Sequence, residues 1–321
     1  LAGGRINTDF IDNSAGVDTS DHEVNIKILL SGEVASGALP VEERTELLAS
    51  MTDEVATLVL VHNLDQNLAL ATTQARATEL AGAHEEWMAA LVEAGLLNRN
   101  LEFLPSTDQM EARIAEGRGL TRPELAVLLS YTKIWMERQI IDSDLPEDEY
   151  LRDRLVSYFP WRLREEYRAR MEGHPLRREI VATVTTNRFV NSLGPSAAFR
   201  LGIETGAGVR AIIRAQLAAR AILSVAQAER DLTKVSGLSP DTDIALRVSL
   251  QQLVERATRW LLHNRRVGLD IRAETDALSE GVAEIRAELP QLLTPRQQEE
   301  WRRLTDALVA GGAPEELAAG F

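Results

Sequence analysis

Cysteine is absent from this 321-residue sequence, and its absence excludes three kinds of chemistry. Without it there is no disulfide framework, no thiolate metal site and no cysteine nucleophile. Aromatic residues are also scarce, at 5% of the chain, whereas alanine, leucine, glutamate and arginine are abundant, which favours helix throughout. A chain without cysteine suits a cytoplasmic enzyme, so a cytoplasmic location is expected.

Positive charge is in deficit. Lysine and arginine number 35 against 49 aspartates and glutamates, which gives a net charge of −14. A general nucleic-acid surface needs clustered excess basic charge to displace counterions, so no nucleic-acid partner is expected. Apolar runs of about 18 residues are missing, as is a signal peptide, so no membrane partner is expected either. What remains is ordinary globular composition, enough for one large or two ordinary domains.

Residues 5–31 are predicted to form a strand, a polar loop and a helix. Ile6, Thr8 and Phe10 alternate with polar neighbours, as strand residues do. Ser20 and Glu23 have the spacing of a capping box, which predicts that the helix begins at Ser20. Open α/β sheets bind ligands on loops of this kind, and the first amides of a helix can meet an anion.

The rest of the chain is predicted to be helical. Residues 32–40 hold two glycines and a proline and mark the best candidate for a domain boundary. Residues 98–105 are the one later stretch for which an extended conformation is an alternative. A break at residues 194–195 divides the helical domain, 41–321, into two possible sub-bundles, 41–193 and 196–321. Within it, an apolar stripe is expected along residues 52–80, and two long antiparallel helices over 209–234 and 242–266.

Capping boxes predict three helix starts in the later sequence. In each, a serine or threonine is followed three residues later by glutamine or glutamate. Leu120 and Leu125 would also form a hydrophobic staple around the second start. The three pairs are Ser106 with Gln109, Thr121 with Glu124, and Thr294 with Gln297.

Familiar catalytic and metal motifs are absent. No histidine has a second histidine at zincin spacing, and His62, His174 and His263 are scattered, so structural roles are favoured and no metal site is predicted. Residues 202–208 lack the lysine and hydroxyl of a phosphate loop, and no Gly-x-Gly-x-x-Gly follows a strand.

Arginines crowd residues 162–178 of this acidic chain. They are interpreted as a solvated face paired with neighbouring glutamates, with a patch for an acidic partner or a phosphate as the alternative.

Three stretches carry a resemblance to a known family. Residues 13–27 read NSAGVDTSDHEVNIK, and residues 120–131 read LTRPELAVLLSY. The third begins with HPLRREI at His174 and continues through Asn187 to NSLG at 191–194. In this order they resemble the end of the coenzyme domain and two later signatures of the large bacterial NAD-dependent glutamate dehydrogenases. The resemblance implies that the chain is the C-terminal part of a much longer polypeptide.

The fold class implied is mainly α. Residues 1–31 would be the C-terminal strand and loop at the edge of a Rossmann-like, NAD-binding catalytic domain, and residues 41–321 a large all-α domain. Hexameric glutamate dehydrogenases carry a matching loop, Gly-Gly-Val-x-x-Ser-x-x-Glu, whose serine contacts the substrate's side-chain carboxylate. Residues 15–23 match it except that Ala15 replaces the first glycine. The resemblance therefore implies that Ser20 binds substrate and that Asn13 and Gly16 lie near the coenzyme.

The resemblance further implies that the parent enzyme oxidises L-glutamate to 2-oxoglutarate and ammonia with NAD as cofactor, as a homo-oligomer. In the family the catalytic lysine and carboxylate lie upstream, so no catalytic residue is assigned here and the fragment alone is expected to be inactive. The alternative is a non-catalytic helical module for interaction or assembly.

Overall fold

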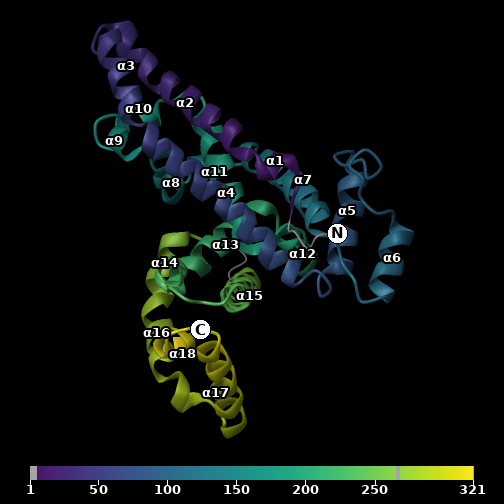
Figure 1. Cartoon of the computed structure of the whole chain (residues 1–321). Helices are drawn as coiled ribbons and strands as arrows, with labels where there is room; N and C mark the ends of the chain where they lie inside the picture. Colours follow the sequence, from purple (N-terminus) through teal and green to yellow (C-terminus); the bar gives the residue numbers. More distant parts are fainter. Residues whose placement is uncertain (1–5, 265–267, 321) are drawn as a thin grey trace. The chain divides into compact units, whose positions relative to one another are not determined.

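The computed structural model describes residues 6–264 and 268–320, and every regular element within those ranges is a helix. Figure 1 shows the helices in chain order. They form two compact units, unit 1 up to Pro195 and unit 2 from Ser196. The prediction of a mainly helical fold is confirmed.

The predicted strand near the N-terminus is wrong. Residues 6–8 have no regular structure, and α1 (Asp9–Asp12) is a single helical turn. The described ranges contain no strand that could pair with this segment, so no edge of a Rossmann-like sheet is seen there. A helical turn satisfies its own backbone groups, whereas a strand needs a neighbour.

The predicted polar loop is also wrong, because α2 (Ser14–Ser36) already begins at Ser14. Ser20 is therefore a residue of the helix interior and not its N-cap. The early start lets α2 bury one continuous face, which includes His22, Asn25 and Ile26.

Unit 1 is built around α7 and α11, which contact each other, while α2 and α4 lie side by side and are joined through α3 (Figure 1). Residues 6–31 thus belong to the same compact unit as the helices that follow them. The remaining elements of the unit are α3 (Val41–Ser50), α4 (Thr52–Ala75), α5 (Ala81–Glu93), α6 (Thr107–Ala115), α7 (Arg122–Ile141), η1 (Leu145–Glu147), η2 (Glu149–Leu151), α8 (Arg152–Tyr158), α9 (Trp161–Arg164), α10 (Arg168–Glu172) and α11 (Arg177–Leu193).

The apolar stripe predicted along residues 52–80 faces the wrong way in the first half of α4. Leu60 and Leu64 are 66% and 54% exposed. The face turned inward combines the buried Val59 with partly buried polar residues, among them His62, Asn63 and Gln66. Hydrogen bonds to α1, α2 and α7 satisfy these polar side chains, and this lets them occupy the packed face.

All three predicted capping boxes are confirmed, at the starts of α6, α7 and α17 (Pro295–Ala310). Leu120 and Leu125 are both buried, as a hydrophobic staple requires. The chain entering α7 is fixed by Gly119, because a Cβ there would lie 2.1 Å from the carbonyl oxygen of Ala77. Only glycine fits so close an approach to the backbone.

Two tryptophans tie α5 to α7. Trp87 donates a hydrogen bond from Nε1 to the hydroxyl of Thr132 at 2.7 Å. Its ring meets Trp135 edge to face, with ring centroids 4.8 Å apart. Between α5 and α6, residues 99–103 form turns, and no strand is found within residues 98–105.

Unit 2 is centred on α13, which packs against both α15 and α16. Of the two long helices predicted over 209–234 and 242–266, the first is broken at Ser224, whose φ of 53° is left-handed, so α13 and α14 are separate helices. The elements are α12 (Ala197–Thr205), α13 (Val209–Ile222), α14 (Val225–Lys234), α15 (Pro240–Asn264), α16 (Ile271–Leu292), α17 and α18 (Glu315–Gly320).

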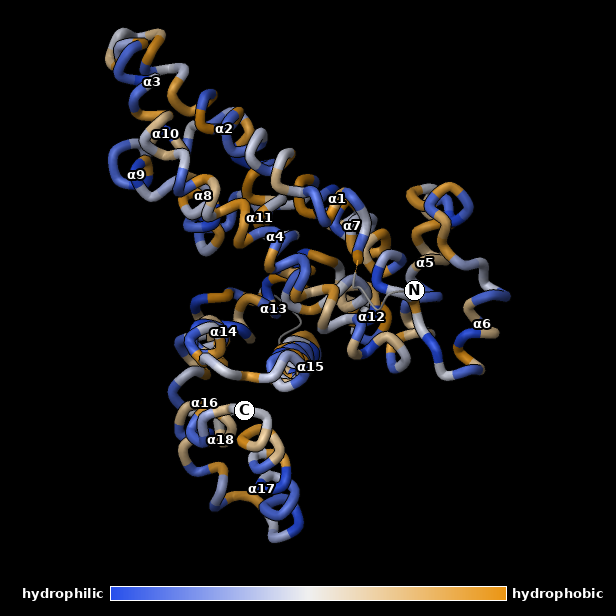
Figure 2. Tube along the Cα trace, viewed as in Figure 1, coloured by the Kyte–Doolittle hydropathy of each residue, from blue (hydrophilic) through white to orange (hydrophobic). Residues whose placement is uncertain are grey.

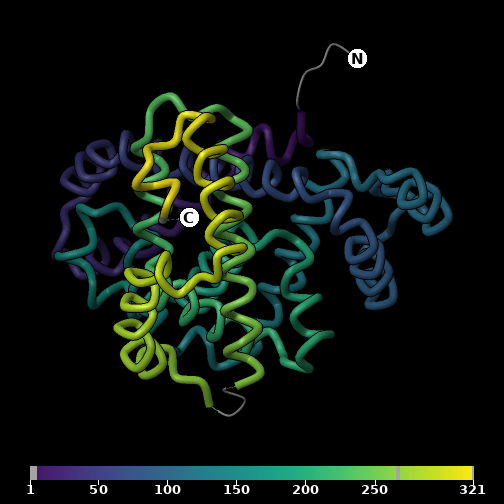
Figure 3. The backbone as a smooth tube through the Cα atoms, turned by 90° about the horizontal axis from the view of Figure 1, so that it is seen from below, coloured from purple at the N-terminus to yellow at the C-terminus, as the bar shows by residue number. Residues whose placement is uncertain are grey.

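The end of unit 2 folds back on itself. Figure 3 shows α17 and α18 in yellow beside the green loop between α14 and α15. Ser239 in that loop donates its backbone N–H to the carbonyl of Gly311 at 3.1 Å. Leu232, Leu246 and Ala318 form a small buried cluster beneath this contact.

No helix in the described part of the chain is both long enough and apolar enough to cross a membrane. Figure 2 shows hydrophobic and hydrophilic segments alternating along the helices, in keeping with one packed face on each.

Candidate functional site

The outer face of α2 carries the three residues that the resemblance places in the active site. Gly16 and Ser20 are four residues apart and lie on one side of the helix, Asn13 is the N-cap residue just before it, and all three are exposed. A Cβ added at Gly16 would meet nothing within 4 Å. Because Ser20 is inside the helix, the capping role predicted for its hydroxyl is wrong.

The inner face of α2 is polar at the same level. Asp18, His22 and Asn25 follow one another at spacings of four and three residues. His22 and Asn25 are buried, and Asp18 is half-buried. Three consecutive polar positions on a packed face are costly unless they find partners.

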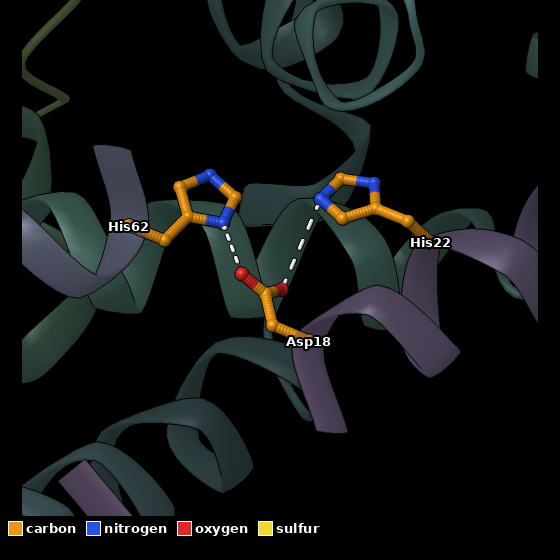
Figure 4. Close-up of side chains that lie close together, drawn as sticks. All are labelled: Asp18, His22 and His62. Carbon is orange, nitrogen blue, oxygen red and sulfur yellow. Dashed lines mark hydrogen bonds and ion pairs between the residues drawn. The ribbon is translucent and has the colours of Figure 1, made fainter. Parts of the chain in front are cut away.

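Asp18 lies between two histidines, as Figure 4 shows. His62 of α4 donates a hydrogen bond from Nδ1 to Asp18 Oδ2 at 2.8 Å. On the other side, His22 Nε2 lies 3.8 Å from Asp18 Oδ1. The carboxylate thus joins two imidazoles that come from different helices.

His22 is fully enclosed by protein. Its ring stacks on Tyr158 of α8 at 4.5 Å between centroids, and more distantly on His62 at 5.6 Å. Burial lowers the pKa of His22 although the Asp18 carboxylate acts to raise it, so the ring is neutral at pH 7. Neither ring nitrogen has a hydrogen-bond partner.

Tyr158 links the inner face of α2 to α8. Its hydroxyl donates to Asp21 Oδ2 at 2.7 Å and accepts from Asn25 Nδ2 at 2.9 Å. Burial, reinforced by the Asp21 carboxylate, raises the pKa of Tyr158 far above its ordinary value, so the phenol stays protonated. Tyr158 is therefore a positioning group and not a base.

His174 holds the same helix from a third side. Its Nδ1 accepts the backbone N–H of Leu176 at 3.1 Å, so its proton is on Nε2, which faces the carbonyl oxygen of Asn25 at 3.1 Å. Burial lowers the pKa of His174, while the hydrogen bond to Asn25 opposes that shift. A neutral ring in this tautomer satisfies both contacts.

Lys133 of α7 completes the polar region between α2, α4 and α7. Its ammonium donates to Gln66 Oε1 at 3.2 Å. The residue is partly exposed along its length, but burial around the ammonium lowers the pKa of Lys133 to about 7, against the attraction of Asp65 and Asp18. A lysine with this pKa can exchange a proton near neutrality.

A second network holds the segment before α1. Arg122, in the Leu-Thr-Arg-Pro-Glu stretch, donates a hydrogen bond from Nε to Asn7 Oδ1 at 2.5 Å. Its Nη2 donates a second to the backbone oxygen of Asn67 at 3.1 Å. Asn7 in turn donates to Asp12 Oδ1 at 2.5 Å. Residues 120–131, which carry part of the resemblance, thus hold the segment that leads into residues 13–27, which carry another part.

Asp18, His22, His62 and Lys133 were not predicted to lie together. The signal was the four-residue spacing of Asp18 and His22, which means proximity only on a helix, and this segment was predicted to be a loop. His62 and Gln66 have the same spacing on α4, on a face predicted to point outward.

The arginine-rich region is paired, as interpreted from the sequence, although the partners come from other segments than expected. Arg177 and Arg178 both contact Glu147, and Arg168 contacts Asp153 at 3.0 Å. Arg170 reaches Glu33 at 2.6 Å. These ion pairs favour a structural role over a site for a phosphate.

Two family models match this chain, one over its first helices and one over its later ones. Residues 117–321 match a family model described as glutamate dehydrogenase, C-terminal. Residues 1–73 match a second, described as bacterial NAD-glutamate dehydrogenase, catalytic domain. The second match contains α2 and most of α4, and the first contains α7.

Individual relatives give the same picture. The chain is 39% identical to an NAD-specific glutamate dehydrogenase of Mycobacterium tuberculosis over 327 residues, and 39% identical to one of Pseudomonas aeruginosa over 319 residues. A third, from Halomonas elongata, is 37% identical over 318 residues. Each alignment covers 99% of this chain but 20% of the relative, so the chain spans about a fifth of the length of these proteins.

Proposed function

We propose a function from one premise: the chain belongs to the glutamate dehydrogenase family. It serves, in our proposal, as the C-terminal part of an enzyme that oxidises L-glutamate to 2-oxoglutarate and ammonia with NAD. The observation that carries this is the alignment of 99% of the chain, at 39% identity, with NAD-specific glutamate dehydrogenases. The enzyme would act as a homo-oligomer in the cytoplasm.

The exposed face of α2 is the part of this chain that would meet the ligands. Ser20 would hold the side-chain carboxylate of glutamate, while Asn13 and Gly16 would lie near the coenzyme. In support, all three are exposed at the start of α2, Gly16 and Ser20 share one side of it, and the open space over Gly16 leaves room for a ligand to approach the backbone. No residue of the chain is assigned the chemical step.

Replacing Ser20 with Ala in the whole enzyme tests this assignment. Ser20 caps no helix, so the melting temperature should stay unchanged or rise slightly, since alanine favours helix. A lost charge-assisted hydrogen bond is worth about 1.5–3 kcal/mol, which is roughly a ten- to hundredfold fall in kcat/KM for glutamate. NADH affinity should change little.

Thr19→Ala is the matched control. Thr19 is the neighbour of Ser20 on α2, and its hydroxyl bonds to the carbonyl of Ala15 at 2.7 Å within the same helix. Its loss should leave the glutamate kinetics intact. Equal kinetics in wild type and Ser20→Ala would remove Ser20 from the substrate site, and a whole enzyme that forms no NADH from glutamate would end the proposal itself.

The alternative, a non-catalytic module for interaction or assembly, rests on a different observation. Leu60, Val61 and Leu64 of α4 are 66%, 46% and 54% exposed, a short apolar surface open to a partner. The double change Leu60→Gln and Leu64→Gln in the whole protein should then alter its oligomeric state by light scattering. A fall in kcat/KM without any change in assembly would count against this role.

A further inference from the structure

We propose that Asp18, His22 and His62 bind a divalent transition-metal ion that ties α2 to α4. Each residue offers one ligand atom, and the three atoms lie within 4.8 Å of one another. Two imidazoles and a carboxylate are the ligands of a zinc site with three protein groups and an open fourth position. This donor set suits zinc, cobalt or iron(II) and not magnesium or calcium, which take oxygen ligands.

The fold places the ligands without help from a flexible loop. Asp18 and His22 are one turn apart on the 23-residue helix α2, and His62 faces them from the middle of the 24-residue helix α4. Figure 4 shows both rings turned toward the carboxylate. Ligands on two packed helices are held close to their binding geometry before the ion arrives.

His22 supplies an independent reason for a ligand. Its side chain is 0% exposed, and both ring nitrogens lack a hydrogen-bond partner. A buried polar group left without a partner destabilises the folded state. A metal ion on Nε2, the nitrogen that faces Asp18, would give this nitrogen a partner and leave the ring proton on Nδ1. A histidine kept only for packing could be replaced by an apolar side chain without this penalty.

The distances require a modest rearrangement. Tetrahedral ligands at about 2.0–2.2 Å from zinc lie roughly 3.3 Å from one another. His62 Nδ1 lies 2.8 Å from Asp18 Oδ2, so an ion held between these two atoms must spread them slightly. His22 Nε2 lies 3.8 Å from the other carboxylate oxygen, Oδ1, and the three ligand atoms, which lie within 4.8 Å of one another, must draw together around the ion. His62 is 44% exposed, so its ring can turn to make this adjustment. It then carries its remaining proton on Nε2.

The site is distinct from the proposed substrate face. Asn13, Gly16 and Ser20 are on the outer side of α2, and the metal ligands are on its inner side. The ion would act as a structural tie, since binding to the folded state stabilises it by an amount that grows with metal concentration. A test of metal binding and a test of glutamate kinetics can therefore give independent results, and either proposal can be rejected without the other.

The experiment is a titration of the metal-stripped 321-residue chain, free of any affinity tag, with zinc by calorimetry and with cobalt by visible absorption. We expect one ion per chain, cobalt bands of four-coordinate intensity, and a higher melting temperature with zinc. His62→Asn is the main variant because His62 is partly exposed and its loss should not prevent folding. Loss of an outer-shell partner already costs 10–100-fold in affinity, so loss of a ligand should cost about 100-fold or more.

Asp18→Asn should weaken binding to a similar extent, with circular dichroism used to confirm that each variant is folded. His263→Asn, which changes an exposed histidine in unit 2, is the matched control and should bind zinc as the wild type does. Binding that is absent in the wild type, or that survives in His62→Asn at wild-type affinity, would overturn the site and leave a hydrogen-bonded Asp-His pair.

Discussion

Arg113 of α6 holds Glu124 of α7 through two hydrogen bonds, of 2.8 and 3.0 Å. The same carboxylate accepts the backbone N–H and the hydroxyl of Thr121, at 2.7 and 2.8 Å, and so closes the capping box of α7. One side chain thus joins two helices and caps one of them. Burial acts to raise the pKa of Glu124, but the hydrogen bonds from Arg113 and Thr121 outweigh it and lower the pKa.

Arg113→Met should lower the free energy of unfolding by about 1–3 kcal/mol at pH 7, because it removes hydrogen bonds to a partly buried charge. A lowered carboxyl pKa stabilises the fold above the unfolded-state pKa, and this contribution disappears as pH falls through the folded-state value. The gap between variant and wild type should therefore narrow below about pH 4. Urea unfolding of variant and wild type at pH 7 and below about pH 4 measures this difference in unfolding free energy.

Arg118→Met is the control for this prediction. Arg118 pairs with Glu116, but the two side chains are 64% and 58% exposed. Exposed pairs contribute about 0–1 kcal/mol, so this variant should unfold almost as the wild type does. If Arg113→Met and Arg118→Met lowered the free energy of unfolding equally, the Arg113–Glu124 contact would stabilise the fold no more than an exposed ion pair does.

Lys133→Met should make the chain more stable at pH 6. The pKa of Lys133 is lowered to about 7, so the folded state holds the charged form at a cost that the unfolded state does not bear. Allowing for its partial exposure, the gain should be about 1–3 kcal/mol. In the wild type, stability should rise with pH from about 7 to 10, because there the unfolded state binds more protons. The variant should lack this rise in pH-dependent denaturation, and an identical profile would contradict the assignment.

Gly119→Ala should destabilise the chain by about 1–3 kcal/mol, the usual cost of overpacking. Its Cβ would lie 2.1 Å from a backbone oxygen, which cannot turn aside as a side chain can. Gly281→Ala is the matched comparison: it changes a helical glycine of α16 whose Cβ would meet nothing within 4 Å. That variant should gain about 0.5–1 kcal/mol from helix propensity. Thermal melts that rank the two the other way would refute the close contact.

The starts of α6, α7 and α17 could be predicted because a capping box is a local sequence signal. Thr121 and Glu124 need only a three-residue spacing and a following helix, and both are satisfied within α7 itself. The break at Ser224 could not be predicted in this way, since the apolar pattern continues across it. A left-handed serine has no marker in the residue type.

The candidate site was only partly accessible from sequence. Ser20, Gly16 and Asn13 came from the resemblance, and the structure moves them from a loop to an exposed helical face. The cluster of Asp18, His22 and His62 was hidden because residues 60–66 of α4 depart from the usual pattern: His62 and Gln66 face inward while Leu60 and Leu64 face outward. Periodicity assigns apolar residues to the core, so it fails where polar partners occupy the packed face.

The edge-to-face contact of Trp87 and Trp135 gives unit 1 an optical signature of its own. Two indoles 4.8 Å apart couple their electronic transitions, and the buried Trp87, at 3% exposure, is shielded from water. In unit 2, Trp260 is 51% exposed and should emit like an indole in solvent. An excitonic circular-dichroism couplet thus belongs to the α5–α7 contact, so its unfolding can be followed in the unlabelled natural chain.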